Sequence, residues 1–289
     1  MFVERRGAGF VFFVDWQRHG PAASNVVMPR TRPQQVLKRF DPATADAWLR
    51  GVRAVLWPYF RPRVMGIDHL PQGRALIVGC HSGVIPYDAA CTVAAIHEAT
   101  GRVCRSIGDR FFGSATAMED FLNRCGAMVG DPSLVEAALR HDDAVLLFPG
   151  GARDMERSYL TDAYRVVPHR GFAPGRGGYV KAALRTGAPI VPLAVVGAEE
   201  IHVMLGNWAA GARVLGVPLW PFVLSPLPLP AKLYLRFGAP IRLRGTPADA
   251  RRQDRVDALN RQVQARLQRL ITDTVRRRRG IIFSRYDES

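Results

Sequence analysis

Short apolar runs and longer segments with a helical repeat alternate along most of the chain. The apolar runs are bounded by turn residues, as is typical of buried strands, and lie at 63–67, 75–80, 103–107, 127–129, 144–148, 190–196 and 232–237. Segments with helical spacing lie at 88–100, 111–124, 132–141 and 177–186. This alternation predicts an α/β fold in which helices cover both faces of a largely parallel central sheet.

A further helical segment is predicted on each side of this region. Asp41 and Pro42 are typical of an N-cap and a first helical position, and the following apolar residues recur at helical spacing to about Pro58. This N-terminal amphipathic helix is expected to pack on the core or to lie on a membrane surface. The second helix begins near Ala250, and residues 251–279 contain ten arginines and three aspartates, a net charge of +7. The chain is therefore divided into an N-terminal arm with an amphipathic helix (1–60), an α/β core (61–245), and a basic C-terminal helix with a tail (246–289).

The charge of the whole chain predicts an acidic partner. A formal net charge of +15 and a pI near 10.7 suit an anionic membrane surface, an acidic substrate or nucleic acid. The basic C-terminal helix favours anionic lipid, although a nucleic-acid patch or a solvated face has a similar pattern. Because this helix has no interleaved aromatic residues for stacking on bases, no nucleic-acid partner is expected.

The cysteines and the N-terminus indicate the compartment. Cys80, Cys91, Cys104 and Cys125 stand in apolar settings without metal-ligand spacing, which predicts reduced, buried thiols, no metal and a cytoplasmic protein. Asp15 interrupts the apolar N-terminal run too early for a signal peptide. No run reaches the roughly 18 apolar residues of a spanning helix, so a soluble or peripheral protein is expected.

The strand at 75–80 runs directly into the first group of chemically active residues. His81, Ser82 and Gly83 follow it, and Asp88 stands as the predicted N-cap of the next helix. If Gly83 and Pro86 let the loop fold back, the Asp88 carboxylate can fix the tautomer of His81 and leave the other ring nitrogen to take a proton. Two alternatives remain. One is a turn histidine beside a helix cap, and the other is Ser82 as a nucleophile, although this serine stands one position late for G-x-S-x-G.

Two later stretches add candidate substrate-binding residues. The strand at 144–148 is followed by Pro149, Gly150 and Gly151, where a glycine backbone can approach a ligand closely, and then by Arg153, which can hold an anionic headgroup. An ordinary turn with a surface arginine would have the same sequence. Pro192 lies in the strand at 190–196, which is expected to line the floor of the same pocket.

Two more segments have unusual composition. The glycine-rich stretch 171–178 fits neither a P-loop nor G-x-G-x-x-G, and we interpret it as a mobile loop on the substrate side. Residues 205–230 are apolar and aromatic, but their prolines exclude a regular spanning helix. This segment is expected to cover an acyl-sized tunnel, to dip into the lipid interface, or to form an ordinary covered loop.

Taken in order, four stretches resemble the blocks of the glycerophospholipid acyltransferase superfamily, over roughly residues 60–240. HSGVIPYD resembles the family's histidine–aspartate block, LLFPGGARD its FPEGxRS block, APIVPLAVVG its fourth block, and RCGAMVGDP stands at the place of its second block. Six residues rather than four separate the histidine from the aspartate. Gly150 replaces the glutamate of FPEG, as it does in the diacylglycerol-acyltransferase-like branch, which is the branch that this sequence resembles most. The second block lacks its usual arginine near Gly130 and Asp131.

The resemblance implies an O-acyltransferase that moves a fatty acyl group from acyl-CoA or acyl carrier protein to the hydroxyl of a lysophospholipid, glycerolipid or similar lipid. His81 would be the general base, oriented by Asp88, and substrate binding would fall to Ser82, Gly83, Pro149, Gly150, Gly151, Arg153 and Pro192. No cofactor is implied beyond the acyl thioester co-substrate. The expected location is the inner face of the membrane, bound peripherally. The alternatives are a serine-type lipid or thioester hydrolase, and a non-enzymatic protein that binds anionic lipid or nucleic acid.

Overall fold

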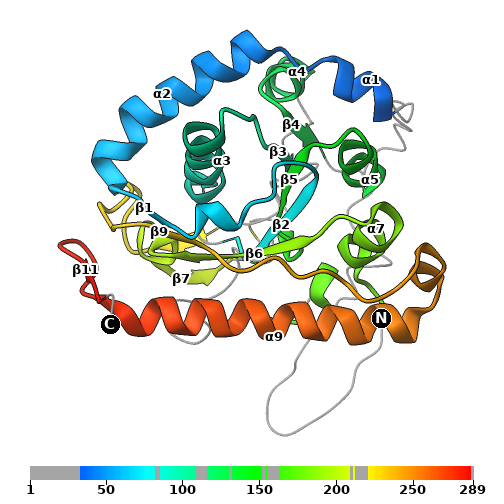
Figure 1. Cartoon of the computed structure of the whole chain (residues 1–289). Helices are drawn as coiled ribbons and strands as arrows, with labels where there is room; N and C mark the ends of the chain where they lie inside the picture. Colours follow the sequence, from blue (N-terminus) through cyan, green and yellow to red (C-terminus); the bar gives the residue numbers. More distant parts are fainter. Residues whose placement is uncertain are drawn as a thin grey trace, which may run out of the picture.

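Figure 1 shows a computed structural model of the chain, which describes residues 33–81, 85–108, 116–129, 132–151, 154, 163–168, 170–208, 211 and 221–287. Within these residues, seven strands form one sheet in the order β1-β9-β6-β2-β5-β3-β4. Their bounds are β1 (Arg63–Met65), β2 (Ala75–Gly79), β3 (Arg105–Gly108), β4 (Ala127–Val129), β5 (Ala144–Leu147), β6 (Ile190–Val196) and β9 (Tyr234–Phe237).

The sheet is largely parallel. β2 pairs in parallel with β5 and β6, and β3 does so with β5 and β4. β9 is antiparallel to β6, and β1 is parallel to β9, so these two strands run in the opposite direction. The predicted fold class is therefore confirmed. The carboxyl ends of the five parallel strands, the start of β9 and the start of β1 lie at one edge of the sheet, which we call the carboxyl edge.

Helices cover both faces of the sheet. The buried side chains of α1 (Pro33–Lys38), α5 (Pro132–Arg140), α7 (Gly178–Thr186) and α9 (Gln253–Arg277) form one apolar cluster with the sheet. Those of α2 (Pro42–Phe60) and α3 (Tyr87–Thr100) form another on the other face. The strands alternate between the clusters, as in β2, where Leu76 and Val78 join the first, and Ala75 and Ile77 join the second.

Both flanking helices that the sequence predicted are present and pack on this core. Asp41 caps α2 and accepts a hydrogen bond from the Ala43 amide at 3.2 Å, as expected, and the helix continues through Pro58 to Phe60. In α9, the buried residues form one stripe that packs against β6 and α7, and most of the arginines lie on the exposed side. No helix among the described residues is long and apolar enough to cross a bilayer.

Several elements differ from the sequence predictions. Asp88 is not the N-cap of α3, because the helix begins at Tyr87 and Asp88 lies in its first turn. α4 (Thr116–Arg124) packs against β4, and the predicted start of this helix at 111 lies outside the described residues. The apolar stretch 205–230 includes parts of an antiparallel pair that was not predicted, β7 (Met204–Asn207) with β8 (Pro221–Val223).

A second small antiparallel pair follows α9, formed by β10 (Arg278–Arg279) and β11 (Arg285–Tyr286). Four short 3₁₀ segments complete the described elements: η1 (Ile67–His69), η4 (Arg170–Phe172), η5 (Ala198–Glu200) and η6 (Pro247–Arg251).

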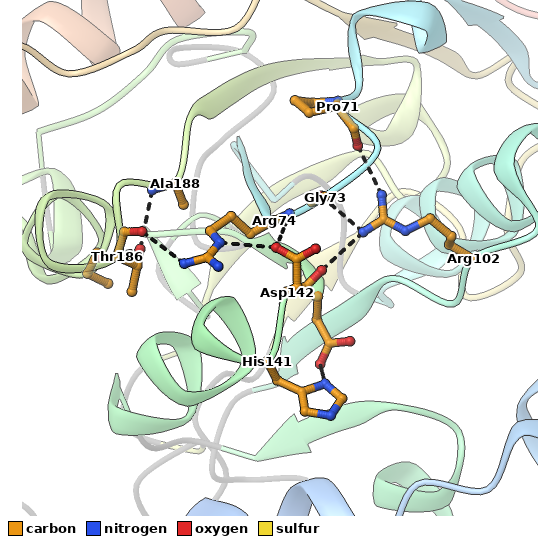
Figure 2. A network of polar contacts seen from close by, with 10 residues as sticks. Pro71, Gly73, Arg74, Arg102, His141, Asp142, Thr186 and Ala188 are labelled. Atoms are coloured by element: carbon orange, nitrogen blue, oxygen red, sulfur yellow. Dashed lines mark hydrogen bonds and ion pairs between the residues drawn. The ribbon is translucent and has the colours of Figure 1, made fainter.

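A polar network fixes the starts of the central strands, at the edge of the sheet opposite the carboxyl edge (Figure 2). Asp142, just before β5, accepts two hydrogen bonds of 3.1 Å from the backbone and side chain of Arg74, just before β2. Arg102 donates to the carbonyls of Pro71 and Gly73 at 2.9 and 3.0 Å. These bonds hold β2 and β5 in register, with Ala75 opposite Ala144, so the loops that follow the two strands emerge side by side.

Candidate active site

His81 and Asp88 meet at the carboxyl edge of the sheet. The five residues of β2 are all buried, so the strand delivers His81 from the centre of the fold. His81 Nδ1 lies 2.8 Å from Asp88 Oδ2. Asp88 is fully buried, and His81 is 8% exposed. The predicted approach of these two side chains across the intervening loop is therefore confirmed.

The first turn of α3 fixes the Asp88 carboxylate. The amide of Ala89 donates to Asp88 Oδ1 at 2.8 Å, while Oδ2 faces His81. A carboxylate is favoured at a helix N-terminus by the unpaired amide groups there. With the Nδ1–H group of His81 donating to this carboxylate, the lone pair of the neutral imidazole lies on Nε2. This is the arrangement that a general base requires.

The aromatic ring of Phe148, the first residue after β5, packs beside the imidazole. The centroids of the two rings are 5.2 Å apart. Gly79, the last residue of β2, leaves room for this contact, because a Cβ atom on it would lie 3.0 Å from the Phe148 ring and 3.1 Å from the Leu193 carbonyl. The strand that carries the histidine and the neighbouring strand therefore pack closely at the site.

A second carboxylate, on Asp154, reaches the site from the turn after β5. Its Oδ2 accepts a hydrogen bond of 3.1 Å from the backbone amide of His81, and the residue is 3% exposed. The Asp154 carboxylate fills the space beside Gly150, where any Cβ atom would overlap it. Because Gly150 has no side chain, Asp154 can fold back onto the backbone of His81.

Sequence reasoning missed Asp154, although it belongs to the FPGGARD stretch. Two features of the sequence could have indicated this contact. Position 150 is a glycine where FPEG has glutamate, and a carboxylate, Asp154, follows four residues later.

The structure limits the role of the Gly150–Gly151 turn in stabilising an oxyanion. The amide of Gly151 donates to the Phe148 carbonyl at 3.0 Å, and this residue has a positive φ of 55°. A turn hydrogen bond thus occupies the amide of Gly151, one of the two glycine amides in this turn. Pro149 is buried, and its carbonyl accepts from Gly171 at 2.9 Å.

That contact places the glycine-rich stretch 171–178 against the site rather than leaving it as an open loop. The Phe172 carbonyl accepts hydrogen bonds from Asn260 at 3.1 Å and Gln264 at 2.9 Å, both on α9. Tyr179, at the start of α7, donates to Asn260 at 2.6 Å. The stretch is therefore hydrogen-bonded to α9, and its mobility stays a prediction.

Among the other predicted site residues, the structure describes Pro192. Pro192 is buried inside β6 opposite Val78, and a Cβ atom on Gly238 would lie 2.9 Å from its ring and 3.0 Å from the side chain of Leu270 on α9. It therefore packs on the α9 side of the sheet, away from α3. Ser82, Gly83 and Arg153 lie outside the described residues, as do Gly130 and Asp131 of the second block.

The thiol of Cys91, close to Asp88 on α3, is unsuited to act as a nucleophile. Cys91 lies one turn beyond Asp88 on α3 and is fully buried. Burial, and to a lesser extent the charge of Asp88, raises the pKa of the Cys91 thiol to about 12, so it is protonated at neutral pH. All four cysteines are buried and none is in a disulfide, as the sequence predicted.

Comparison with known proteins gives a family match over the central part of the chain. Residues 61–196, which include β2, His81 and the Gly150–Gly151 turn, match the family model described as Acyltransferase. The mouse DGAT1/2-independent enzyme synthesizing storage lipids is 27% identical over 189 residues, covering 65% of this chain and 54% of that protein. Over this region the chain is similar to proteins of the glycerophospholipid acyltransferase superfamily. This confirms the resemblance of the four sequence blocks.

Other relatives extend the comparison. An uncharacterized protein of Mycobacterium leprae is 35% identical over 215 residues, covering 70% of this chain and 57% of that protein. The chain thus spans less than three fifths of the length of the curated relatives it matches. Among solved structures, the 1-acyl-sn-glycerophosphate (LPA) acyltransferase PlsC of Thermotoga maritima aligns with a TM-score of 0.47 at 15% identity, over 84% of each chain.

Proposed function

We propose that this chain transfers a fatty acyl group from a thioester, acyl-CoA or acyl carrier protein, to the hydroxyl of a lysophospholipid, glycerolipid or similar lipid. The observation that carries the proposal is the buried hydrogen bond between His81 and Asp88 within the region that matches the Acyltransferase family model. This bond leaves a basic nitrogen oriented at the carboxyl edge of a parallel sheet, where ligands bind in folds of this class.

In the proposed reaction, His81 Nε2 removes the proton of the acceptor hydroxyl as its oxygen attacks the thioester carbonyl carbon. Asp88 orients the imidazole and stabilises the imidazolium that forms. When the tetrahedral intermediate collapses, the carbon–sulfur bond breaks, and the leaving thiolate takes the proton from His81. The new ester and the free thiol are the products, and no covalent enzyme intermediate is needed.

Two further roles belong to the same proposal. The amides of Gly150 and Gly83 are the remaining candidates for stabilising the oxyanion, because the Gly151 amide bonds to the Phe148 carbonyl. Arg153 would hold an anionic acceptor headgroup. The exposed arginines of α9 support binding to an anionic membrane. We propose that the chain binds peripherally to the inner face of that membrane. A nucleic-acid partner is not expected.

Product analysis tests the proposal. The purified chain is incubated with radiolabelled acyl-CoA and a mixed pool of lysophospholipids and glycerolipids, and the labelled lipids are separated. We expect an acylated acceptor, which Ser82→Ala still forms and His81→Ala does not. Release of free fatty acid alone, lost in Ser82→Ala and kept in His81→Ala, would instead show a serine hydrolase.

A further inference from the structure

The β10–β11 hairpin presents large apolar side chains to solvent. Its turn contains Ile281, Ile282 and Phe283, which we call the apolar tip, and these side chains are 42%, 39% and 91% exposed. Gly280, with a φ of 83°, begins the turn. Water is a poor environment for three consecutive side chains of this kind, so an exposed group of them indicates a surface that binds something apolar.

The base of the hairpin is fixed to the core, so the tip cannot fold back to bury itself. Arg278 is paired with Glu200 at 2.6 Å, and the two side chains are 8% and 3% exposed. Tyr234, the first residue of β9, is hydrogen-bonded to Ser284 at 2.7 Å, and both residues are buried. The Lys232 amide donates to the Ile281 carbonyl at 3.2 Å. These contacts hold the apolar tip outward.

The hairpin lies at the carboxyl edge, the edge of the sheet that also carries His81. β9 is antiparallel to β6, with Tyr234 opposite Val196, so the start of β9 lies beside the end of β6. β6 is in turn parallel to β2, which ends just before His81. Figure 1 shows the hairpin (red), the C-terminal end of α2 and β7 on the same side of the molecule.

Neighbouring segments extend the apolar surface. Tyr59, near the end of α2, donates to the Pro228 carbonyl at 2.5 Å, and residues 228–232 lead to the amide that contacts the apolar tip. Large exposed side chains along this path are Tyr59, Leu224 and Leu227. Exposed apolar side chains therefore also stand on segments that lead to the hairpin from elsewhere in the sequence.

Cationic side chains flank the tip. Arg276, Arg279 and Arg285 are exposed on either side of it, and the chain carries a net charge of +15. An apolar tip between arginines matches the boundary of an anionic bilayer, where acyl chains lie below phosphate groups. Two copies of this chain would instead repel each other through their like charge.

We propose that the apolar tip, Ile281–Phe283, inserts into an anionic lipid bilayer and turns the carboxyl edge, with His81, toward the membrane. This inference rests on the proposed function, in which the acceptor is a lipid. The inference goes beyond the proposed membrane binding by the arginines of α9, because it assigns insertion into the bilayer to the uncharged apolar tip that follows the helix.

Flotation with vesicles of phosphatidylglycerol and phosphatidylcholine tests the docking. Phe283→Ser is expected to lower the partition coefficient about tenfold, the scale of losing one aromatic side chain from the interface. Phe283→Trp should retain binding, because tryptophan favours the membrane interface. The matched control is Phe121→Ser, at a side chain that is 42% exposed on α4, and it should bind as the unchanged chain does. Thermal unfolding checks that each variant is folded.

Three results would overturn the docking proposal. They are an unchanged chain that does not float with these vesicles, a Phe283→Ser variant that floats as well as the unchanged chain, and a change of oligomeric state in Phe283→Ser without a change in vesicle binding. Transfer of an acyl group to a short-chain acceptor that is monomeric in water, measured without vesicles, tests the proposed function separately. Transfer without flotation would reject the docking alone, and flotation without transfer would reject the chemistry alone.

Discussion

At the scale of single residues, His81 is held from two sides. Asp88 binds its side chain from α3, and Asp154 binds its backbone amide from the turn after β5. The second contact depends on Gly150, because any Cβ atom there would overlap the Asp154 carboxylate. The glycine that replaces the glutamate of FPEG therefore leaves the space that the Asp154 contact requires.

We predict that Gly150→Ala displaces Asp154 and lowers kcat by about tenfold or more, because a small misplacement of a catalytic group is costly. The matched control is Gly108→Ala, at the end of the neighbouring parallel strand β3, where an added Cβ atom would meet only the Met128 carbonyl at 3.9 Å. Steady-state kinetics of both variants, with their unfolding midpoints, make the comparison. Equal activity in the two variants would show that the Asp154 contact does not position His81.

Sequence predicted part of this residue-scale arrangement. The meeting of His81 and Asp88 followed from a buried strand and a turn-rich loop before a helix. The contact between Asp154 and the backbone amide of His81 was not predicted. It depends on the path of the turn after β5, and the hydrophobic pattern of the sequence does not encode that path. The expected role of Pro192 in the pocket is not supported by its position, since its ring packs toward α9.

At the scale of elements, a buried ion pair joins the end of α9 to the carboxyl edge. Arg278 donates to both carboxylate oxygens of Glu200, at 3.0 and 2.6 Å, and both residues contact the hydroxyl of Tyr164. Burial, with the nearby charge of Glu200, raises the pKa of Tyr164 well above its ordinary value. The tyrosine therefore stays neutral and takes part in this network as a hydrogen-bonding group.

We predict that Arg278→Met lowers the free energy of unfolding by about 3–5 kcal/mol, because Glu200 would remain buried without its partner. The double variant Glu200→Gln with Arg278→Met should lose less, since no uncompensated charge remains. Arg279→Met is the matched control, with a side chain that is 73% exposed, and should change stability by about 0.5 kcal/mol or less. Urea unfolding measures all three. A loss in Arg279→Met as large as that in Arg278→Met would contradict this account.

Strand direction was the main element-scale feature that sequence did not determine. The apolar runs at 63–67 and 232–237 predicted strands, but nothing in a short apolar run encodes whether it lies parallel to its neighbours. Direction follows from the connections, and β9 enters the sheet beside β6 from the carboxyl edge. The β7–β8 pair was missed because prolines dominate the stretch around it.

At the scale of the whole molecule, α9 is part of the core and also carries surface charge. Val263, Leu267 and Ile271 are fully or almost fully buried in the cluster that covers one face of the sheet. Deleting the helix would expose that cluster, so point variants are the better probe of membrane binding. We retain the division at residues 60 and 245 as a proposal about segments, and α2 and α9 of the outer two segments pack on the α/β core.

The central claim is that His81 is the general base for acyl transfer, and kcat/KM of His81→Ala tests it most directly. We predict a fall of about 10²–10⁴-fold, the usual range for losing a general base. His97→Ala, on the same helix as Asp88, is the control and should keep full activity. If His81→Ala is folded, as shown by an unchanged unfolding midpoint, and keeps a kcat/KM close to that of His97→Ala, the proposed mechanism is wrong.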